Sequence, residues 1–185
     1  MPKSEKQKMI AGELYRAGDL ELQADAAANK AWLVRYNAAL AASPAERRVL
    51  LMEHFGGVGA GVVVRPPFHC DYGYNITLGA DVFLNFGCIV LDVVAVTIGD
   101  GTQVGPGVQI LTADHPRDAE TRRSGLEFGR PIAIGANVWI GGAALILPGV
   151  TVGDDAVIGA GAVVTRDVPA GATVVGNPAR VVATR

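Results

Sequence analysis

Residues 132–167 divide into six successive sixes, IAIGAN, VWIGGA, ALILPG, VTVGDD, AVIGAG and AVVTRD. The third position of every six is aliphatic and is usually followed by glycine. These aliphatic residues are Ile134, Ile140, Ile146, Val152, Ile158 and Val164. A period of six fits neither the 3.6-residue period of a helix nor the alternation of a long strand. It is a repeat, and repeats of this kind indicate stacked structural units.

Short strands joined by tight turns can wind into a three-sided coil with one aliphatic side chain per side pointing to the axis. No single unit buries that side chain alone, but stacked units bury it against the equivalent residues above and below. Three units of six make one coil, so residues 132–167 predict two complete coils. Glycine makes up 24 of the 185 residues, which suits a fold with a tight turn on every side.

The repeat extends upstream of this stretch. The aliphatic series there is Leu78, Leu84, Val90, Ile98, Val104 and Ile110. All steps are six residues except the step from Val90 to Ile98, which is eight. We therefore expect two additional residues near Asp92 and Val93, and a coil that begins near Val62.

Residues 112–130 interrupt the repeat with the polar sequence TADHPRDAETRRSGLEFGR. We interpret this segment as a loop that leaves the wall of the coil and returns at Ile132. Long excursions from a rigid scaffold often carry function.

Residues of about 4–55 have helical character. One stripe along a helix is predicted by Leu22, Ala26, Asn29, Leu33, Tyr36 and Leu40. Ser43, Pro44 and Glu46 form a capping box that begins a short helix over 44–55. We therefore divide the chain into a helical cap, 1–57, and a coil domain, 58–185. The cap either only covers an open end of the coil or also supplies part of an acceptor pocket.

The composition excludes several classes of function. A net charge of −2 gives no general attraction to nucleic acid or to an anionic membrane. Residues 131–153 carry no charge, but their six-residue glycine pattern argues against a membrane-spanning helix. The polar start of the chain has no signal-peptide pattern. With only Cys70 and Cys88 as cysteines, we expect a cytoplasmic protein with reduced thiols.

Five residues are candidates for chemistry or for ligand binding. His115, in the predicted loop, is either a solvated titratable group or a general base that accepts a proton from an attacking alcohol. Glu127 is a candidate to orient its ring. Asn85 is either a left-handed turn residue or an amide donor to a developing oxyanion. Arg166 and Arg180 are either solvated or pair with ligand phosphates.

Seven stretches distributed over nearly the whole chain resemble the maltose and galactoside O-acetyltransferases, a family of left-handed β-helix acyltransferases. They are MIAGELYRAGD at 9–19, PPFHCDYGYNI at 66–76, LDVVAVTIGD at 91–100, TADHP at 112–116, NVWIGG at 137–142, IGAGAVVTRDVP at 158–169 and GNPARVV at 176–182.

The resemblance implies a mainly β fold, a left-handed parallel β-helix of hexapeptide repeats with an N-terminal helical segment. It also implies acetyl transfer from acetyl-CoA to a sugar hydroxyl, in a homotrimer with each site between two subunits. His115 is then the general base, and Asn85 steadies the thioester oxygen. Asp71 and Asp92 lie near the sugar. No metal is required, because a thioester is already activated.

For acetyl-CoA, the resemblance implies the groove between neighbouring coils. Gly142 and Ala160 would offer backbone groups to the pantetheine arm, and Thr165, Arg166 and Arg180 would meet the nucleotide. Trp139 either forms an apolar wall nearby or simply packs in its coil.

The sequence departs from the galactoside branch at two positions. Val93 stands where that branch tends to have a second acid, and Ala17 stands where it places an acceptor-binding aspartate. The LDV and GNPAR stretches favour a maltose- or glucose-type acceptor. A galactoside, a nodulation-factor chito-oligosaccharide or an antibiotic remains an alternative.

Two other classes of function fit a hexapeptide coil. A metal enzyme like the γ-class carbonic anhydrases needs three imidazoles together, whereas His54 is expected outside the coil and His69 and His115 are isolated from each other. A non-catalytic scaffold would not need the loop at 112–130.

Overall fold

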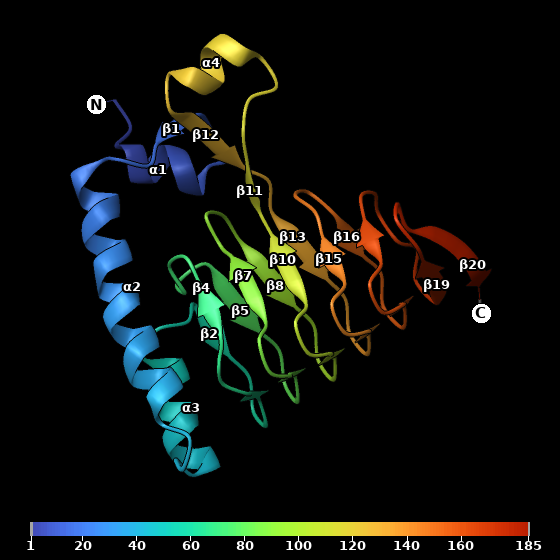
Figure 1. Cartoon of the computed structure of the whole chain (residues 1–185). Helices are drawn as coiled ribbons and strands as arrows, with labels where there is room; N and C mark the ends of the chain where they lie inside the picture. The colour runs from blue at the N-terminus through green and yellow to red at the C-terminus, as the bar shows by residue number, and fades with distance from the viewer. Residues whose placement is uncertain (1, 185) are drawn as a thin grey trace.

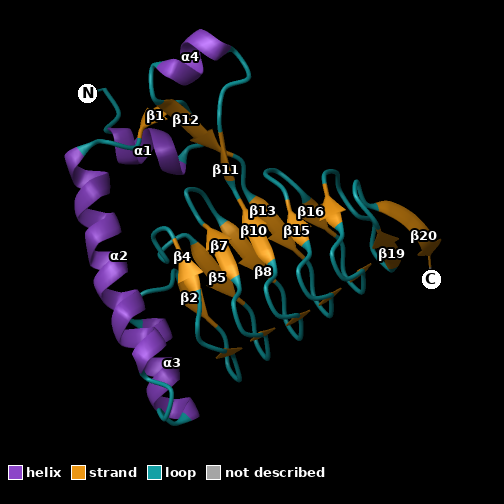
Figure 2. Cartoon of the chain, in the orientation of Figure 1, coloured by secondary structure: helices purple, strands orange, loops and turns teal. Residues whose placement is uncertain are grey.

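The computed structural model describes residues 2–184 as a three-sided parallel β-helix with a helical cap at its N-terminal end (Figures 1 and 2). The first side contains β2 (Gly57–Val58), β5 (Ile76–Leu78), β8 (Val96–Ile98), β13 (Ile132–Ile134) and β16 (Thr151–Val152). The second contains β3 (Val63–Val64), β6 (Phe83–Leu84), β9 (Gln103–Val104), β14 (Trp139–Ile140), β17 (Val157–Ile158), β19 (Ala172–Val175) and β20 (Arg180–Thr184). The third contains β4 (His69–Cys70), β7 (Ile89–Leu91), β10 (Gln109–Leu111), β15 (Leu145–Ile146) and β18 (Val163–Val164).

The repeat explains the stacking of these short strands. Ile134 pairs with Val152, Ile140 with Ile158 and Ile146 with Val164, each eighteen residues apart. All six side chains are buried in one continuous core along the axis. A two-residue strand gains little by itself, so burial of each aliphatic against its neighbours supplies most of the stability. The predicted β-helix is thus confirmed.

The coils are wider in the N-terminal half of the helix. Thr77 pairs with Thr97, twenty residues further along the chain, which confirms the two additional residues expected near Asp92. Gly57 likewise pairs with Thr77, so a second widening follows Cys70. That widening was not predicted from the sequence, and the predicted start of the coil is therefore too late. The coil begins at Gly57–Val58, not near Val62.

The cap contains α1 (Glu5–Ile10), β1 (Tyr15–Arg16), α2 (Leu20–Ala38) and α3 (Pro44–Met52). The capping box at Ser43 and Glu46 is present as predicted. Two expectations need correction. Helix α3 stops at Met52 instead of continuing to 55, and the region is not helical throughout because Tyr15 and Arg16 form a strand.

Helices α2 and α3 close the N-terminal end of the coil (Figure 1). Trp32, Tyr36, Leu51 and Phe55 are buried in the same core cluster as the aliphatics of the coil. The Tyr36 hydroxyl donates a hydrogen bond of 2.7 Å to the carbonyl of Val64 on β3. Of the predicted stripe, Leu22, Asn29 and Tyr36 are buried, whereas Leu40 lies beyond the end of α2 and is exposed.

The segment 112–130 leaves the coil as predicted, and it has its own structure. It contains β11 (Ala113–Asp114), α4 (Ala119–Arg123) and β12 (Leu126–Gly129), and it projects away from the coil beside the cap (Figure 2). Strand β12 pairs antiparallel with β11 and with β1 of the cap. A second small core joins cap and coil beneath this sheet, formed by Met9, Tyr15, Leu22, Tyr72 and Val93.

The C-terminal segment covers the last coil. β20 turns back and pairs antiparallel with β19 on the second side. The amide of Val163 on the third side donates to Gly176, and the carbonyl of Val163 accepts from Ala179. On the first side, Val168 forms a bridge with Val152.

Candidate functional site

His115 lies at the base of the excursion loop, directly after β11. Its Nε2 is 3.7 Å from Oε2 of Glu127 on β12, and its side chain is 60% exposed. Glu127 Oε1 accepts a 3.0 Å hydrogen bond from the Tyr15 hydroxyl. An imidazole beside a carboxylate can take up a proton at low cost, because the carboxylate compensates the positive charge.

Asp114 fixes the loop where His115 begins. Its carboxylate accepts hydrogen bonds from Arg117 and Arg130, at 2.8 and 2.7 Å, and from the backbone N–H of His115 at 2.8 Å. Burial alone would raise the pKa of Asp114, but these donors outweigh it and hold the pKa below its ordinary value. Asp114 therefore anchors the loop and is not the partner of the His115 ring.

Asp92 is completely buried, and both of its carboxylate oxygens accept backbone N–H groups. Oδ1 accepts from Asp71 and Tyr72, and Oδ2 accepts from Gly73 at 2.7 Å and from Asn75 at 3.4 Å. Burial, with a smaller contribution from the Asp71 charge, raises the pKa of Asp92 to about 7 against the opposing effect of these bonds. In this conformation Asp92 shapes the turn after β4 and has no surface to offer a sugar, which corrects the expectation of direct contact.

Asp71 is presented by that turn and is partly exposed. Burial, and then the nearby charge of Glu127, raise the pKa of its carboxyl to about 6. Asp71, Glu127 and His115 therefore meet at what we call the third corner, where the chain passes from the third side to the first. A hydroxyl-bearing ligand bound there would find two carboxylates as acceptors and one imidazole.

Asn85 lies at a different edge, the second corner, where the chain passes from the second side to the third. In register with Asn85, the later coils have Gly105, Gly141 and Gly159. The left-handed position of this turn is Gly87, with φ 73°, so the interpretation of Asn85 as the left-handed residue is wrong. Its Oδ1 accepts the Phe86 N–H at 2.9 Å, which leaves the amide NH₂ as the donor of this side chain.

The residues predicted to bind acetyl-CoA fall into two groups. Gly142 and Ala160 stack on adjacent coils at the second corner, where the Gly142 carbonyl accepts the N–H of Gly161. Thr165 and Arg166 follow β18 at the third corner. Arg166 and Arg180 line a common cavity of about 150 Å³ formed by the C-terminal segment. Trp139 is 60% exposed on the second side, so it does not simply pack in its coil.

One chain therefore assembles only part of the predicted site. Leu91 is six positions after Asn85 along the third side. At ~3.3 Å per residue, the second and third corners are therefore up to about 20 Å apart. His115, Glu127 and Asp71 are at one corner; Asn85, Gly142 and Ala160 are at the other.

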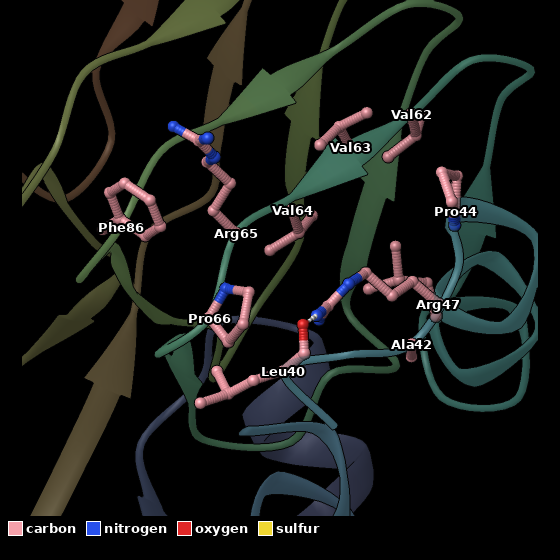
Figure 3. Close-up of a pocket in the computed structure, with 11 residues that line it drawn as sticks. Leu40, Ala42, Pro44, Arg47, Val62, Val63, Val64, Arg65, Pro66 and Phe86 are labelled. Carbon is pink, nitrogen blue, oxygen red and sulfur yellow. Dashed lines mark hydrogen bonds between the residues drawn. The ribbon is translucent and has the colours of Figure 1, made fainter. Parts of the chain in front are cut away.

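A separate apolar pocket of about 320 Å³ lies between the α2–α3 connection and β3 (Figure 3). Val62, Val63 and Pro44 form apolar parts of its wall, and Arg65 and Phe86 lie at the side nearest β6. The Arg65 guanidinium stacks over Phe86 at 4.2 Å from the ring centre. None of the predicted site residues lines this pocket.

Sequence reasoning missed Tyr15 and Asn29. Tyr15 was assigned to a helix, although Gly12 and Gly18 on either side of it are a signal against a continuous helix. The amide of Asn29 donates to the carbonyls of Cys70 and Asp71 and ties α2 to the strand end that carries Asp71. The sequence places Asn29 on the predicted helical stripe but does not indicate which groups its side chain contacts. His69 is exposed on β4.

Within residues 2–184, no three His, Cys, Asp or Glu side chains are grouped in a way that could hold a metal ion. No helix in the same range combines the length and the apolar character that crossing a lipid bilayer requires.

Comparison with known proteins gives consistent results along the chain. The maltose acetyltransferase hexapeptide capping motif matches residues 8–59, and the bacterial transferase hexapeptide, in six repeats, matches residues 131–166. Nodulation protein L of Rhizobium meliloti is 61% identical over 181 residues, which cover 98% of this chain and 99% of that protein.

Two solved structures are similar over the full length. A maltose O-acetyltransferase from Clostridium difficile superposes with a TM-score of 0.96 at 46% identity, covering 98% of this chain and 97% of that one. A hexapeptide-repeat acetyltransferase from Vibrio cholerae, solved in complex with acetyl coenzyme A, has a TM-score of 0.91 at 37% identity and covers 98% of both chains.

Proposed function

The chain belongs to the hexapeptide-repeat acetyltransferases that carry a maltose-acetyltransferase capping motif, and we propose that it transfers the acetyl group of acetyl-CoA to a sugar hydroxyl, with His115 as the general base. The observation that carries this proposal is the placement of His115 beside Glu127 and Asp71 at the third corner. This arrangement suits proton removal from a hydroxyl that the nearby carboxylates hold in place.

In the proposed reaction, the imidazole of His115 accepts the proton of the sugar hydroxyl as the oxygen attacks the thioester carbonyl carbon. The carbon–sulfur bond then breaks, and the imidazolium returns its proton to the departing CoA sulfur. Glu127 compensates the transient charge on the ring. The transfer is direct, in a ternary complex, because holding both substrates together can supply an effective molarity of ~10⁵ M or more.

The side-chain NH₂ of Asn85 is proposed to donate a hydrogen bond to the thioester oxygen as negative charge develops on that oxygen. Removing one such donor typically lowers kcat by a factor of about 10²–10³. Since Asn85 and His115 lie at different corners of one chain, we propose that each site is formed by the third corner of one subunit and the second corner of its neighbour. A closed ring of three subunits, as the sequence resemblance implies, satisfies this pairing at every interface.

Acetyl-CoA is proposed to lie in the groove between the second corner of one subunit and the third corner of its neighbour. The similar Vibrio cholerae structure was solved in complex with acetyl coenzyme A, which supports this choice of ligand. Gly142 and Ala160 provide a narrow backbone edge for the pantetheine arm. Arg166 and Arg180, which share one cavity, can pair with the phosphates, and Thr165 lies next to them. No metal has a step in this scheme, because the thioester is already activated.

The acceptor is proposed to be a sugar of the maltose or glucose type held by Asp71. A second candidate is a chito-oligosaccharide, which the 61% identity to a nodulation protein favours. Ranking glucose, maltose, galactosides and chito-oligosaccharides by kcat/KM decides between them. A sugar that exceeds all others by tenfold or more identifies the acceptor class.

The catalytic part of the proposal is tested with His115→Ala. Because a base contributes roughly 10²–10⁴-fold, we expect kcat to fall by about that factor, while acetyl-CoA binding by calorimetry changes little. Release of free CoA thiol is the readout. Turnover equal to that of the wild type would remove His115 from the mechanism, and no turnover by the wild-type protein with any sugar would remove the proposed function itself.

A further inference from the structure

Tyr15 connects the cap to the proposed base. It lies on β1, where it pairs in register with Glu127 on β12. The side chain is 1% exposed, and its hydroxyl donates a 3.0 Å hydrogen bond to Glu127 Oε1. Met9, Leu22 and Tyr72 pack in the same small core, so the tyrosine ring has little freedom to move.

The hydroxyl holds one of the two carboxylate oxygens of Glu127, and the other oxygen faces His115 at 3.7 Å. A carboxylate is planar and rigid, so fixing Oε1 also fixes the direction of Oε2. Without the hydroxyl, the only side-chain hydrogen bond that Glu127 makes to the described residues is lost. The carboxylate would then be free to rotate away from the ring.

The charges around Glu127 make this anchor useful. Asp71 lies close enough for its pKa to be raised by the Glu127 charge, and Tyr72 is also within reach of that charge. Repulsion from Asp71 favours displacement of the Glu127 carboxylate. Burial, and then the Glu127 charge, raise the pKa of Tyr15 far above its ordinary value, so the phenol stays protonated and remains a donor.

We propose that Tyr15 is a positioning residue for acetyl transfer, which holds the Glu127 carboxylate in the orientation that supports His115. The inference rests on the proposed function, and it makes the cap a part of the catalytic apparatus in addition to a cover for the coil. Neither His115 nor the acceptor has to touch Tyr15 for this effect.

The test begins with Tyr15→Phe, which removes one oxygen atom and keeps the ring in its core. We expect kcat to fall about 10- to 100-fold, the loss typical when the hydrogen-bond partner that orients a metal ligand is removed. KM for acetyl-CoA should change less than about twofold, because the residues proposed to bind acetyl-CoA are untouched.

Tyr36→Phe is the matched control. Tyr36 is also fully buried in the cap and also donates its hydroxyl to the coil, to the Val64 carbonyl. It lies at the closed end of the helix, away from Glu127. We expect this variant to lose a similar amount of stability and to keep the wild-type kcat. An equal loss of kcat in both variants would show a general loosening of the cap and would overturn the proposal.

A double-mutant cycle with Glu127→Gln separates positioning from packing. In the Glu127→Gln variant the charged carboxylate that Tyr15 is proposed to orient is absent. If Tyr15 acts only through that carboxylate, adding Tyr15→Phe to this variant lowers kcat little further. Fully additive losses would overturn the inference. His115→Ala, measured in the same assay, keeps the two proposals distinct: if it retains activity, the assignment of the base fails, whereas a normal Tyr15→Phe beside an inactive His115→Ala refutes only the role of Tyr15.

Discussion

At the scale of single residues, two aspartates at the same corner have opposite environments. Asp92 satisfies four buried backbone N–H groups and in return fixes the turn that carries Asp71. Asp71 lies on the surface of that turn, where burial and the Glu127 charge oppose its ionisation. One carboxylate is therefore needed for the shape of the site, and the other is available for a ligand.

We predict that Asp71→Asn stabilises the free protein at neutral and alkaline pH. The pKa of Asp71 is raised from 3.8 to about 6, so the folded state binds the proton more tightly than the unfolded state does. The associated stability is present below about pH 4 and is lost as the pH rises past 6. Asp71→Asn removes the carboxylate charge, so the variant does not lose this stability as the pH rises. The difference in Tm between variant and wild type should therefore grow from pH 4 to pH 8, and a difference independent of pH contradicts the prediction.

The matched change Asp92→Asn should have the opposite effect. An amide group in this position turns its NH₂ toward at least one pair of backbone donors, and leaving buried donors unsatisfied costs about 1–3 kcal/mol each. Urea unfolding should show a lower midpoint with an unchanged slope. Acceptor KM should rise in both variants, in Asp71→Asn by loss of a contact and in Asp92→Asn by displacement of Asp71.

At this scale the sequence predicts residue types better than partners. His115 was selected from the TADHP stretch, Asn85 from its place after Leu84 and Glu127 from its place in the loop, and their roles stay predictions. Tyr15 was not found, because its partner is 112 positions away and nothing in a single sequence indicates that β1 pairs with β12. Asp92 was found, but its role was misjudged, because burial of a carboxylate depends on backbone groups that carry no sequence signal.

At the scale of the element, different positions within the second corner have different steric requirements. At Gly141 an added Cβ would come within 2.5 Å of the Ala160 amide nitrogen on the next coil. At Gly107 the backbone has φ 69°, but no atom lies within 4 Å of an added Cβ. The first glycine is required by contact between coils and the second by backbone conformation.

These two positions form a matched pair of variants. Gly107→Ala should cost about 1 kcal/mol, the penalty for a left-handed alanine. Gly141→Ala has to separate two stacked coils, so we expect a loss of at least about 2–3 kcal/mol. Urea titration of both variants measures the difference. Equal losses would mean that the corner can relax, and that the stack is softer than its short contacts indicate.

The six-residue period predicted the elements in the coil to within a residue or two, because each strand is determined by its own buried aliphatic. The prediction failed where a segment has no such aliphatic residue to mark it. The widening after Cys70 was missed because Asp71–Asn75 gives no aliphatic marker, and the strand at Tyr15 was missed because two residues are too few to show a period.

At the scale of the whole molecule, the separation of the two corners has a consequence that can be measured by subunit complementation. Asn85→Ala and His115→Ala should each be nearly inactive alone. If a site takes its base from one subunit and its oxyanion donor from the next, mixed trimers contain some sites with both residues intact. In a closed ring of three, every trimer that contains both variants has one such site, which is a third of the wild-type number.

The experiment uses co-expression of the two variants with different affinity tags and a two-step purification. Activity near a third of wild type in the purified mixed trimers supports sites shared between subunits. Mixed assemblies as inactive as their parents would place both residues in the site of one chain, or would show that the chain does not form a ring. Trimers that mix wild-type subunits with one variant at a time show how activity depends on the number of intact sites.

The covering of the last coil by the C-terminal segment has a consequence for how the chain behaves in a crowded solution. A column of identical rungs is a template on which further rungs could grow, since its final strands would expose backbone donors and acceptors as amyloid fibrils do at their tips. Here β20, Gly176, Ala179 and Val168 occupy those groups on all three sides, and α2 and α3 block the opposite end. The molecule can thus use a polymer-like architecture without polymerising.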